Sequence, residues 1–371
     1  MALTLHGTVS DNTVVLSRQN ANPLVINGDM AVAQRATSAT GLTGSNYPVC
    51  DRWLTDIGTG GTWTVSQAAD APTGSGFRSS TKYDCTTANG SLSAGSYMTH
   101  QMRFEGQDLQ LFKKGTSSAE SFTVSFWVKS AKTGTYILEL WDQDNTRQVS
   151  QAYTISSADT WEKKVLSFPA DTTGAFGDDN AASLHMFFWL LSGTNYASGT
   201  LSTTWTSNTN ANRAVGQVNL ADSTDNDWYI TGVQLEVGDF DANSIAPFQH
   251  ESFGDSLKRC ERYFCKSYNY SIAPGTNASS DANAKRGAVF VYRQRDTNAV
   301  GFSFFHPSEM RTNPTMTNYS HDGTSGKFTS STTTTTISTN AALNGTRLSM
   351  AYGTGSAADD NYAHFVCEAE L

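Results

Sequence analysis

The class of fold follows from one short stretch of the chain, Ser121-Phe122-Thr123-Val124-Ser125-Phe126-Trp127-Val128-Lys129. A period of two places its apolar residues Phe122, Val124, Phe126 and Val128 on one face of a half-buried β-strand. The turn Lys132-Thr133-Gly134 follows, and then a second run in which Tyr136, Leu138 and Leu140 share a face. A third run, Val149 to Ile155, comes after the turn at 142–145. The pattern predicts an antiparallel meander.

Similar runs continue on both sides of this meander, from Asn22 to about Phe248. The run Trp161 to Phe168 ends at Pro169, which cannot donate to a strand ladder. The run Leu184 to Leu191 is apolar on both faces, as in a central strand covered on each side, and Trp228 to Val237 completes the set. About eight to ten strands in two sheets fit this rhythm, which predicts a jelly-roll β-sandwich.

A different period follows the sandwich. Within Ser252 to Phe264, residues Leu257, Cys260 and Phe264 recur at helical spacing with charged residues opposite, so we expect a connector helix. Further strand-like runs predict a second, smaller β-sandwich; they are Ala288 to Tyr292, Val300 to Phe305, Thr315 to Tyr319, Thr332 to Ile337, Arg347 to Tyr352 and Tyr362 to Glu368.

The all-β chain of 371 residues is thus expected to divide into four parts. They are an N-terminal attachment arm (1–22), a jelly roll (23–250), a connector helix (251–265) and a C-terminal β-rich tip domain (266–371). The arm has an equal alternative, a plain strand added to the next domain.

Composition and charge exclude several classes of protein. The net charge of −9 and a pI near 5.2, without a basic cluster, argue against binding to nucleic acid. No run of about 18 apolar residues could cross a membrane, and no secretory signal is recognisable. The five cysteines lack metal-ligand or disulfide spacing and are expected to be buried free thiols (Cys50, Cys85, Cys260, Cys265 and Cys367).

Signals for catalysis are also missing, so we expect no enzyme. The neighbouring carboxylates lie in turn-like settings rich in Asn, Gly and Ser (Asp178 with Asp179, Asp222 with Asp225 and Asp227, Asp359 with Asp360). No cofactor is expected. A structural calcium ion is a weaker alternative, for which the oxygen-rich loops Asp142 to Asn145 and Asp239 to Asn243 offer ligands.

Several motifs resemble a group of marine bacteriophage and prophage tail-fibre-like structural proteins. The first runs from Asn22-Pro23-Leu24-Val25-Ile26-Asn27-Gly28-Asp29 to Arg35, followed by Cys50-Asp51-Arg52-Trp53. The others, in the same order as in the group, are Ser125 to Ser130, Ser157 to Lys164, Tyr229 to Gly238 and Ala246 to Gly254, with looser matches at Cys260 to Ser267 and Met310 to Thr315. The resemblance implies a carbohydrate-binding-module-like jelly roll and a homotrimer.

The resemblance implies a virion protein, a tail fibre or receptor-binding subunit, assembled in the host cytoplasm and bound to other virion proteins through the N-terminal arm. We expect it to attach the particle to host surface polysaccharide or lipopolysaccharide, without membrane insertion. Glycan binding needs aromatic faces and polar edges, and the predicted residues lie in the tip domain: Tyr292, Arg293, Arg295, Tyr319 and His321. Further aromatic candidates are Trp53, Trp63, Trp141, Trp205, Tyr268 and Tyr270, most of which are expected to be core residues.

Two other functions stay open. The short arm also fits a purely architectural protein that decorates the head or tail. A capsular polysaccharide depolymerase is the third candidate, disfavoured because the sequence has neither a β-helix repeat nor a convincing pair of catalytic carboxylates.

Overall fold

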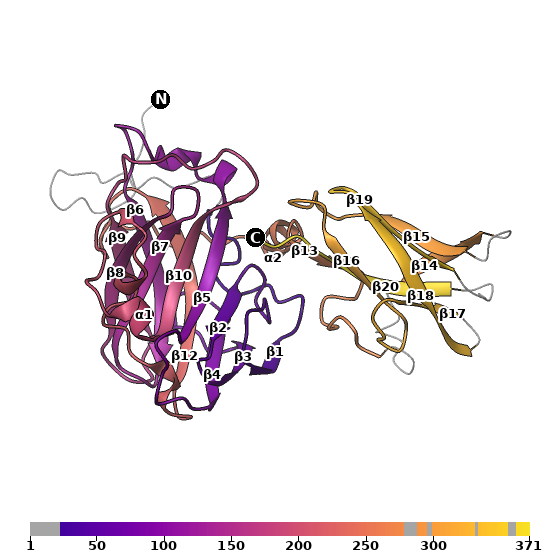
Figure 1. Cartoon of the computed structure of the whole chain (residues 1–371), viewed down its shortest axis with the longest axis horizontal. Helices are drawn as coiled ribbons and strands as arrows, with labels where there is room; N and C mark the ends of the chain where they lie inside the picture. Colours follow the sequence, from indigo (N-terminus) through magenta and orange to yellow (C-terminus); the bar gives the residue numbers. More distant parts are fainter. Residues whose placement is uncertain (1–22, 278–287, 295–298, 331–332, 355–360) are drawn as a thin grey trace.

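The structure, a computed structural model, describes residues 23–277, 288–294, 299–330, 333–354 and 361–371. They form two β domains that lie side by side with a short helix between them (Figure 1). The all-β class is confirmed. The attachment arm predicted for residues 1–22 lies outside the described residues.

The large domain is a jelly-roll sandwich of two antiparallel sheets, each with six strands in the described residues. The first sheet has the order β1 (Ser38–Leu42), β3 (Thr62–Ala68), β4 (Ser80–Thr87), β12 (Asp227–Val237), β6 (Phe122–Ser130), β9 (Glu162–Phe168). The second has the order β11 (Thr206–Ser207), β8 (Arg147–Ile155), β7 (Gly134–Asp142), β10 (Ala182–Ser192), β5 (Tyr97–Glu105), β2 (Leu54–Gly58). Each sheet turns one face toward the other sheet, so apolar residues alternate with outward-facing residues along the strands.

The predicted core faces are confirmed. The four alternating apolar residues of β6 and the three of β7 are fully buried between the sheets: Phe122, Val124, Phe126, Val128, Tyr136, Leu138 and Leu140. β10 is buried on both faces, as predicted for the run Leu184 to Leu191. No other sheet of the described residues covers its outward face, however. On that face His185, Phe187 and Trp189 line a recess beneath the helix α1 (Thr194–Ala197).

The small domain is one antiparallel sheet in the described residues, with the path β13 (Phe264–Lys266), β20 (Asn361–Glu368), β14 (Val289–Gln294), β15 (Ala299–Phe305), β19 (Leu348–Thr354), β18 (Thr333–Asn344), β17 (Lys327–Ser330). β20 also pairs with β16 (Thr315–Tyr319) and β17, so the ladder folds back on itself. A second, smaller β domain follows the jelly roll, but its described strands belong to one folded sheet, whereas the sequence predicted a sandwich. The short strands β13 and β17 were not predicted, since three or four residues carry little periodic signal.

The connector helix is shorter than the sequence suggested. α2 spans Phe253–Cys260. Its N-cap residue is Ser252, whose side chain accepts a hydrogen bond from the Asp255 amide. Leu257 and Cys260 pack against the large domain, as their spacing predicts. Phe264 does not continue this stripe, because it starts strand β13 and pairs with Glu368.

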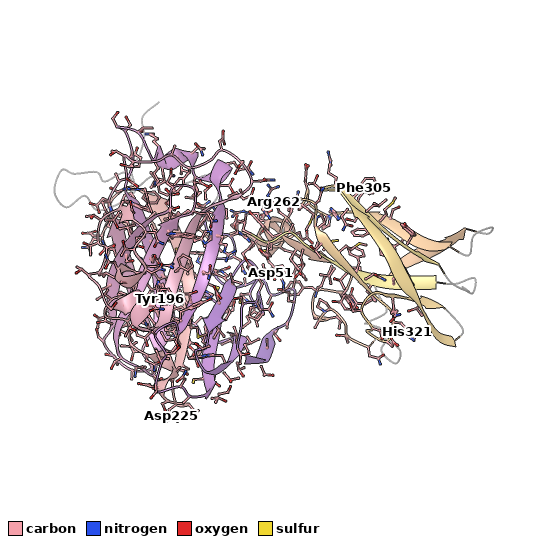
Figure 2. The ribbon with its side chains drawn as sticks, in the orientation of Figure 1. Asp51, Tyr196, Asp225, Arg262, Phe305 and His321 are labelled. Atoms are coloured by element: carbon pink, nitrogen blue, oxygen red, sulfur yellow. The ribbon has the colours of Figure 1, made fainter. Side chains whose placement is uncertain are left out.

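Buried ion pairs join the two domains. Arg52 of the large domain is 2% exposed and bonds Glu370, which follows β20. Arg262, after α2, makes a bidentate pair with Glu105 at 2.8 and 2.7 Å. Figure 2 labels Arg262 and Asp51 at this junction. Burial opposes the charge on Arg52, but Glu370 more than offsets it and raises the pKa of the guanidinium. The two domains are therefore in contact through paired charges, of which Arg52 and Glu105 are buried and the Glu370 side chain is 9% exposed.

All five cysteines are buried and free, as predicted. None of the helices in the described part of the chain has the length and apolar character needed to cross a membrane.

One buried carboxyl gives the large domain a pH-dependent stability. Glu236 of β12 is 9% exposed, and its Oε2 has no hydrogen-bond partner among the described residues. Burial raises the pKa of Glu236 from 4.5 to about 7. The folded state then binds more protons than the unfolded state, so stability falls as the pH rises between these two values.

We expect wild-type protein to lose roughly 2–3 kcal/mol of stability between pH 5 and pH 8 through this group, and Glu236→Gln to remove that loss. Urea denaturation at the two pH values measures the difference. Asp225→Asn, in the exposed turn before β12, is the matched control and should leave the wild-type pH dependence intact. Equal pH dependence in Glu236→Gln and wild type would contradict the assignment.

Candidate binding site

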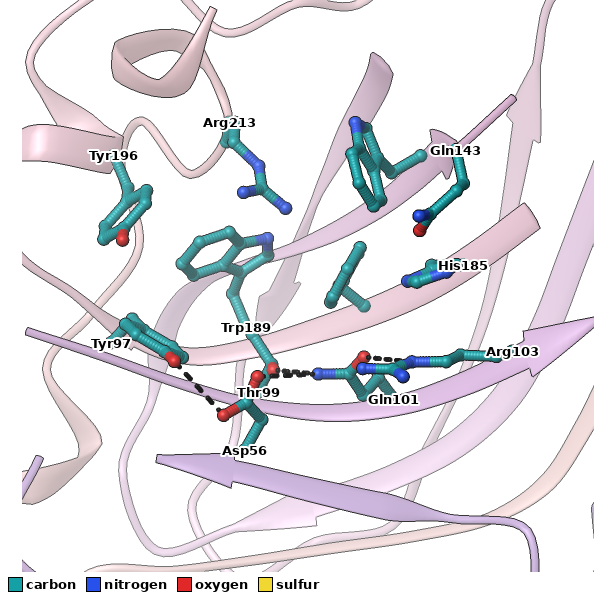
Figure 3. Close-up of a pocket in the computed structure, with 12 residues that line it drawn as sticks. Asp56, Tyr97, Thr99, Gln101, Arg103, Gln143, His185, Trp189, Tyr196 and Arg213 are labelled. Carbon is teal, nitrogen blue, oxygen red and sulfur yellow. Dashed lines mark hydrogen bonds between the residues drawn. The ribbon is translucent and has the colours of Figure 1, made fainter. Parts of the chain in front are cut away.

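One recess of the large domain lies on the outer face of the second sheet. It has a volume of about 340 Å³, within the range of pockets that bind small ligands. Its floor consists of outward residues of the adjacent strands β7, β10 and β5, with Asp56 of β2 at one edge. Figure 3 shows these side chains converging from the strands and from the segment after α1. We call it the β10 recess.

Aromatic rings form much of its wall. Trp189 of β10 packs against Tyr196 of α1 at 5.4 Å between centroids, and Tyr196 packs edge-on against Tyr97 of β5 at 5.7 Å. At the other end, Trp141 of β7 meets His185 edge-on at 5.0 Å, with Phe187 between the two groups. These rings are held by sheet and helix backbone, so their faces are fixed before any ligand arrives.

A buried ion pair fixes the centre of the β10 recess. Arg213 donates to both oxygens of Glu139, from Nε at 2.8 Å and from Nη2 at 3.0 Å. Trp189 Nε1 donates to Glu139 Oε2 at 2.9 Å. The guanidinium of Arg213 also lies 5.2 Å from the ring of Trp189 and 5.2 Å from that of Phe187. Glu139 therefore orients both the arginine and the indole.

Two polar atoms at the other end of the recess are unpaired. Trp141 Nε1 and His185 Nε2 are buried and have no hydrogen-bond partner among the described residues. Burial, and then the charges of Arg103 and Arg213, lower the pKa of His185 to about 3. His185 is therefore neutral at ordinary pH and offers a hydrogen bond without a charge. Buried polar atoms usually have a hydrogen-bond partner, which a ligand or a water molecule could supply for these two.

A row of polar side chains borders the β10 recess along β5. Tyr97 donates to Asp56 at 3.2 Å, Gln101 donates to Asp56 at 3.3 Å, and Arg103 Nε donates to Gln101 at 3.3 Å. Arg103 also donates to the Leu371 carbonyl at 2.7 Å. The row therefore runs from Tyr97 to the junction with the small domain.

This arrangement suits a sugar. The less polar face of a pyranose ring stacks on an aromatic ring, and its hydroxyls exchange hydrogen bonds with amides, carboxylates and guanidinium groups. The β10 recess offers both kinds of contact side by side. Both oxygens of Glu139 accept hydrogen bonds from Arg213 and Trp189.

The tip residues predicted as the glycan site are not brought together by any described contact. Tyr292 and Arg293 belong to β14, but their side chains are outside the description, and Arg295 lies outside the described residues. Tyr319 ends β16 and packs against Tyr268 at 6.2 Å. The His321 amide donates to Thr329 at 2.6 Å. Figure 2 shows His321 on the small domain, far from Tyr196 on the large one. Their role in binding stays a prediction.

Of the other aromatic candidates, Trp141 lines the β10 recess. Trp53, Trp63 and Trp205 belong to the core, as expected for most of the set. Tyr268 is buried and stacks on His364, while Tyr270 is 37% exposed and accepts from the Ala33 amide.

Sequence reasoning missed most of this recess, namely Asp56, Tyr97, Gln101, Arg103, His185, Trp189, Tyr196 and Arg213. The sequence contains one signal for this recess. In the run Leu184 to Leu191, which is apolar on both faces, the positions that point outward include His185 and Trp189.

In the two loops considered for calcium, aspartate oxygens already accept hydrogen bonds from other protein groups. Asp142 bonds Lys114 and accepts from Asn145 at 2.9 Å, and Asp241 accepts from Ser244 and Asn243. Among the described residues, no group of three or more His, Cys, Asp and Glu could hold a metal ion.

Comparison with known proteins gives a distant likeness. No protein-family model and no curated protein sequence matches the chain. Among solved structures, it is similar to the enzymatically active domain of bacteriophage CBA120 tailspike protein 4, with 15% identity over 50% of this chain and 19% of that one, at a TM-score of 0.29. The present chain therefore matches about a fifth of that protein.

Two carbohydrate-binding modules are similarly distant. TmCBM61 in complex with β-1,4-galactotriose has 9% identity over 58% of this chain and 99% of that one, with a TM-score of 0.29. The family 11 module of Clostridium thermocellum, in complex with a β-1,3-1,4-mixed-linked tetrasaccharide, has 10% identity over 57% and 99%, with a TM-score of 0.28. At these identities the likeness concerns the fold alone.

Proposed function

We propose that this chain is a glycan-binding virion protein of a bacteriophage, a tail fibre or receptor-binding subunit that holds host surface polysaccharide in the β10 recess. The observation that carries the glycan-binding part is the recess itself, in which fixed aromatic rings lie beside the unpaired Trp141 Nε1 and His185 Nε2. The virion part is supported by the ordered motifs between Asn22 and Gly254, which resemble phage fibre proteins.

The recess favours binding without cleavage. A glycosidase needs one carboxyl that can protonate the leaving oxygen and a second carboxylate at a suitable distance. Here Glu139 serves Arg213 and Trp189, and Asp56 accepts from Tyr97 and Gln101. These contacts hold the two carboxylates as structural acceptors and leave the recess to act by recognition.

An array of bacterial lipopolysaccharides and capsular polysaccharides tests this proposal with the full chain. We expect binding to a subset of the glycans and no new reducing ends after incubation with the glycan that binds best. Antibody against the chain should label phage particles and reduce their adsorption to host cells. Failure to bind any glycan would contradict the binding role, and new reducing ends would favour a depolymerase.

A further inference from the structure

A second recess lies on the opposite sheet of the sandwich, where the outer face of β6, β9 and β12 meets two loops. It has a volume of about 310 Å³. Trp127 of β6 stands between Lys163 of β9 and Thr231 of β12, which are its direct cross-strand neighbours. Directly opposite residues point to the same face of a sheet, so the partly buried Trp127 and the exposed Lys163 form one wall. We call this the Trp127 recess.

The opposite wall is a packed aromatic cluster from two loops. Phe77 and Phe248 meet edge-on at 5.0 Å, and His250 lies 5.1 Å from Phe77 and 4.9 Å from Phe248. The cluster depends on a glycine: Gly232 has a φ of +63°, and a Cβ added there would lie 2.5 Å from the Phe77 ring. A side chain at position 232 would push Phe77 out of place.

One buried polar atom in this recess has no partner. Gln234 lines the recess and is 5% exposed. Its Nε2 donates to the Ala246 carbonyl at 2.9 Å, but its Oε1 accepts no hydrogen bond from any described residue. An unpaired buried amide oxygen is unfavourable, so a ligand that donates a hydrogen bond to Gln234 Oε1 would offset that cost.

Lys163 is the one lysine or arginine among the described residues that line the Trp127 recess. Lys163 is exposed and forms no ion pair with any described residue. None of the described residues that line the recess is acidic. An anionic ligand would therefore meet the positive charge of Lys163 and no carboxylate among the described lining residues.

We propose that the Trp127 recess is a second glycan site, specific for an acidic sugar of the uronic acid class. The apolar face of the sugar stacks on Trp127 or the phenylalanine pair, a hydroxyl donates to Gln234 Oε1, and the carboxylate pairs with Lys163. With sites on both outer faces of the sandwich, one chain contacts two segments of polysaccharide, and its apparent affinity rises with no new contact in either site.

The probe is a short galacturonate oligomer, and its binding is measured by titration calorimetry. The protein is the full chain carrying Trp141→Ala, which weakens the β10 recess so that binding at the Trp127 recess is measured. We expect binding that weakens as salt increases and is at least tenfold weaker for galactose oligomers of the same length. Lys163→Gln should weaken galacturonate binding several-fold and remove most of its salt dependence. Trp127→Ala should reduce it at least tenfold. Lys258→Gln, which removes an exposed lysine from α2, is the matched control and should change nothing.

Equal binding of galacturonate and galactose oligomers, no binding of either, or indifference to both Lys163→Gln and Trp127→Ala would overturn the second site. None of these outcomes contradicts glycan binding in the β10 recess, provided that Trp141→Ala still weakens binding of the array glycans. The opposite result is also possible to distinguish. If galacturonate binding depends on Lys163 but Trp141→Ala leaves array binding unchanged, the second site is supported and the β10 recess is contradicted as the first. Circular dichroism and thermal melting show that each variant is folded.

Discussion

Replacing Trp141 with alanine is expected to weaken binding of the best array glycan by at least tenfold, a loss of on the order of 2 kcal/mol. Trp141 is the one indole of the β10 recess that keeps both a partly exposed ring and an unpaired Nε1. The variant therefore removes a stacking face and a hydrogen-bond donor together. Titration calorimetry with the full chain measures the change.

A second substitution separates the two contributions of this side chain. Trp141→Phe keeps an aromatic face but loses the donor, so its affinity should lie between those of wild type and Trp141→Ala. The matched control is Trp161→Ala, because Trp161 is partly exposed on the other sheet, where it donates to Asp70 at 2.9 Å. If Trp161→Ala weakens binding as much as Trp141→Ala, the ligand does not occupy the β10 recess.

Replacing Glu370 with alanine is expected to destabilise the protein by about 3–5 kcal/mol, and to lower the midpoint of thermal unfolding by about 10 °C. The reason is that Arg52 would stay buried at 2% exposure after losing the carboxylate that neutralises it. Glu370 also pairs with Arg35 at 3.2 Å. Scanning calorimetry measures the loss and shows whether the two domains then unfold separately.

Glu368 provides the matched control for this junction. It pairs with the same Arg35 at 3.3 Å, but its side chain is 51% exposed, so Glu368→Ala should cost less than about 1 kcal/mol. The double variant Arg52→Met with Glu370→Leu should recover much of the stability, because it removes both buried charges. Similar midpoints for Glu370→Ala and Glu368→Ala would show that the buried pair does not hold the domains together.

Arg103 connects the junction to the β10 recess, so we expect changes at the junction to alter binding there. Arg103 donates to Gln101 in the polar row and to the Leu371 carbonyl at the end of the tail. The Leu371 carbonyl also accepts from Tyr47 at 3.0 Å. Loosening the tail in Glu370→Ala would free Arg103 and disturb one end of the recess, so this variant should show a smaller loss of glycan affinity than Trp141→Ala.

The sequence by itself determined the class of fold, because strand alternation is a local property that each run carries alone. Phe122 to Val128 and Tyr136 to Leu140 indicate their buried faces without knowledge of their neighbours. The helix at Phe253–Cys260 and most strands of the small domain were readable for the same reason. The strands between Ser38 and Glu105 carry mixed polar and apolar residues and were not assigned from the sequence.

Only the tertiary structure decided where ligands could bind. Asp56, Gln101 and Trp141 are far apart in the chain, and they line one recess because β2, β5, β10 and β7 are neighbours in one sheet. The same holds for Trp127, Lys163 and Gln234 on the opposite sheet. Periodicity tells which face of a strand is buried, but strand order decides which side chains share the other face, and that order is set by contacts between distant segments.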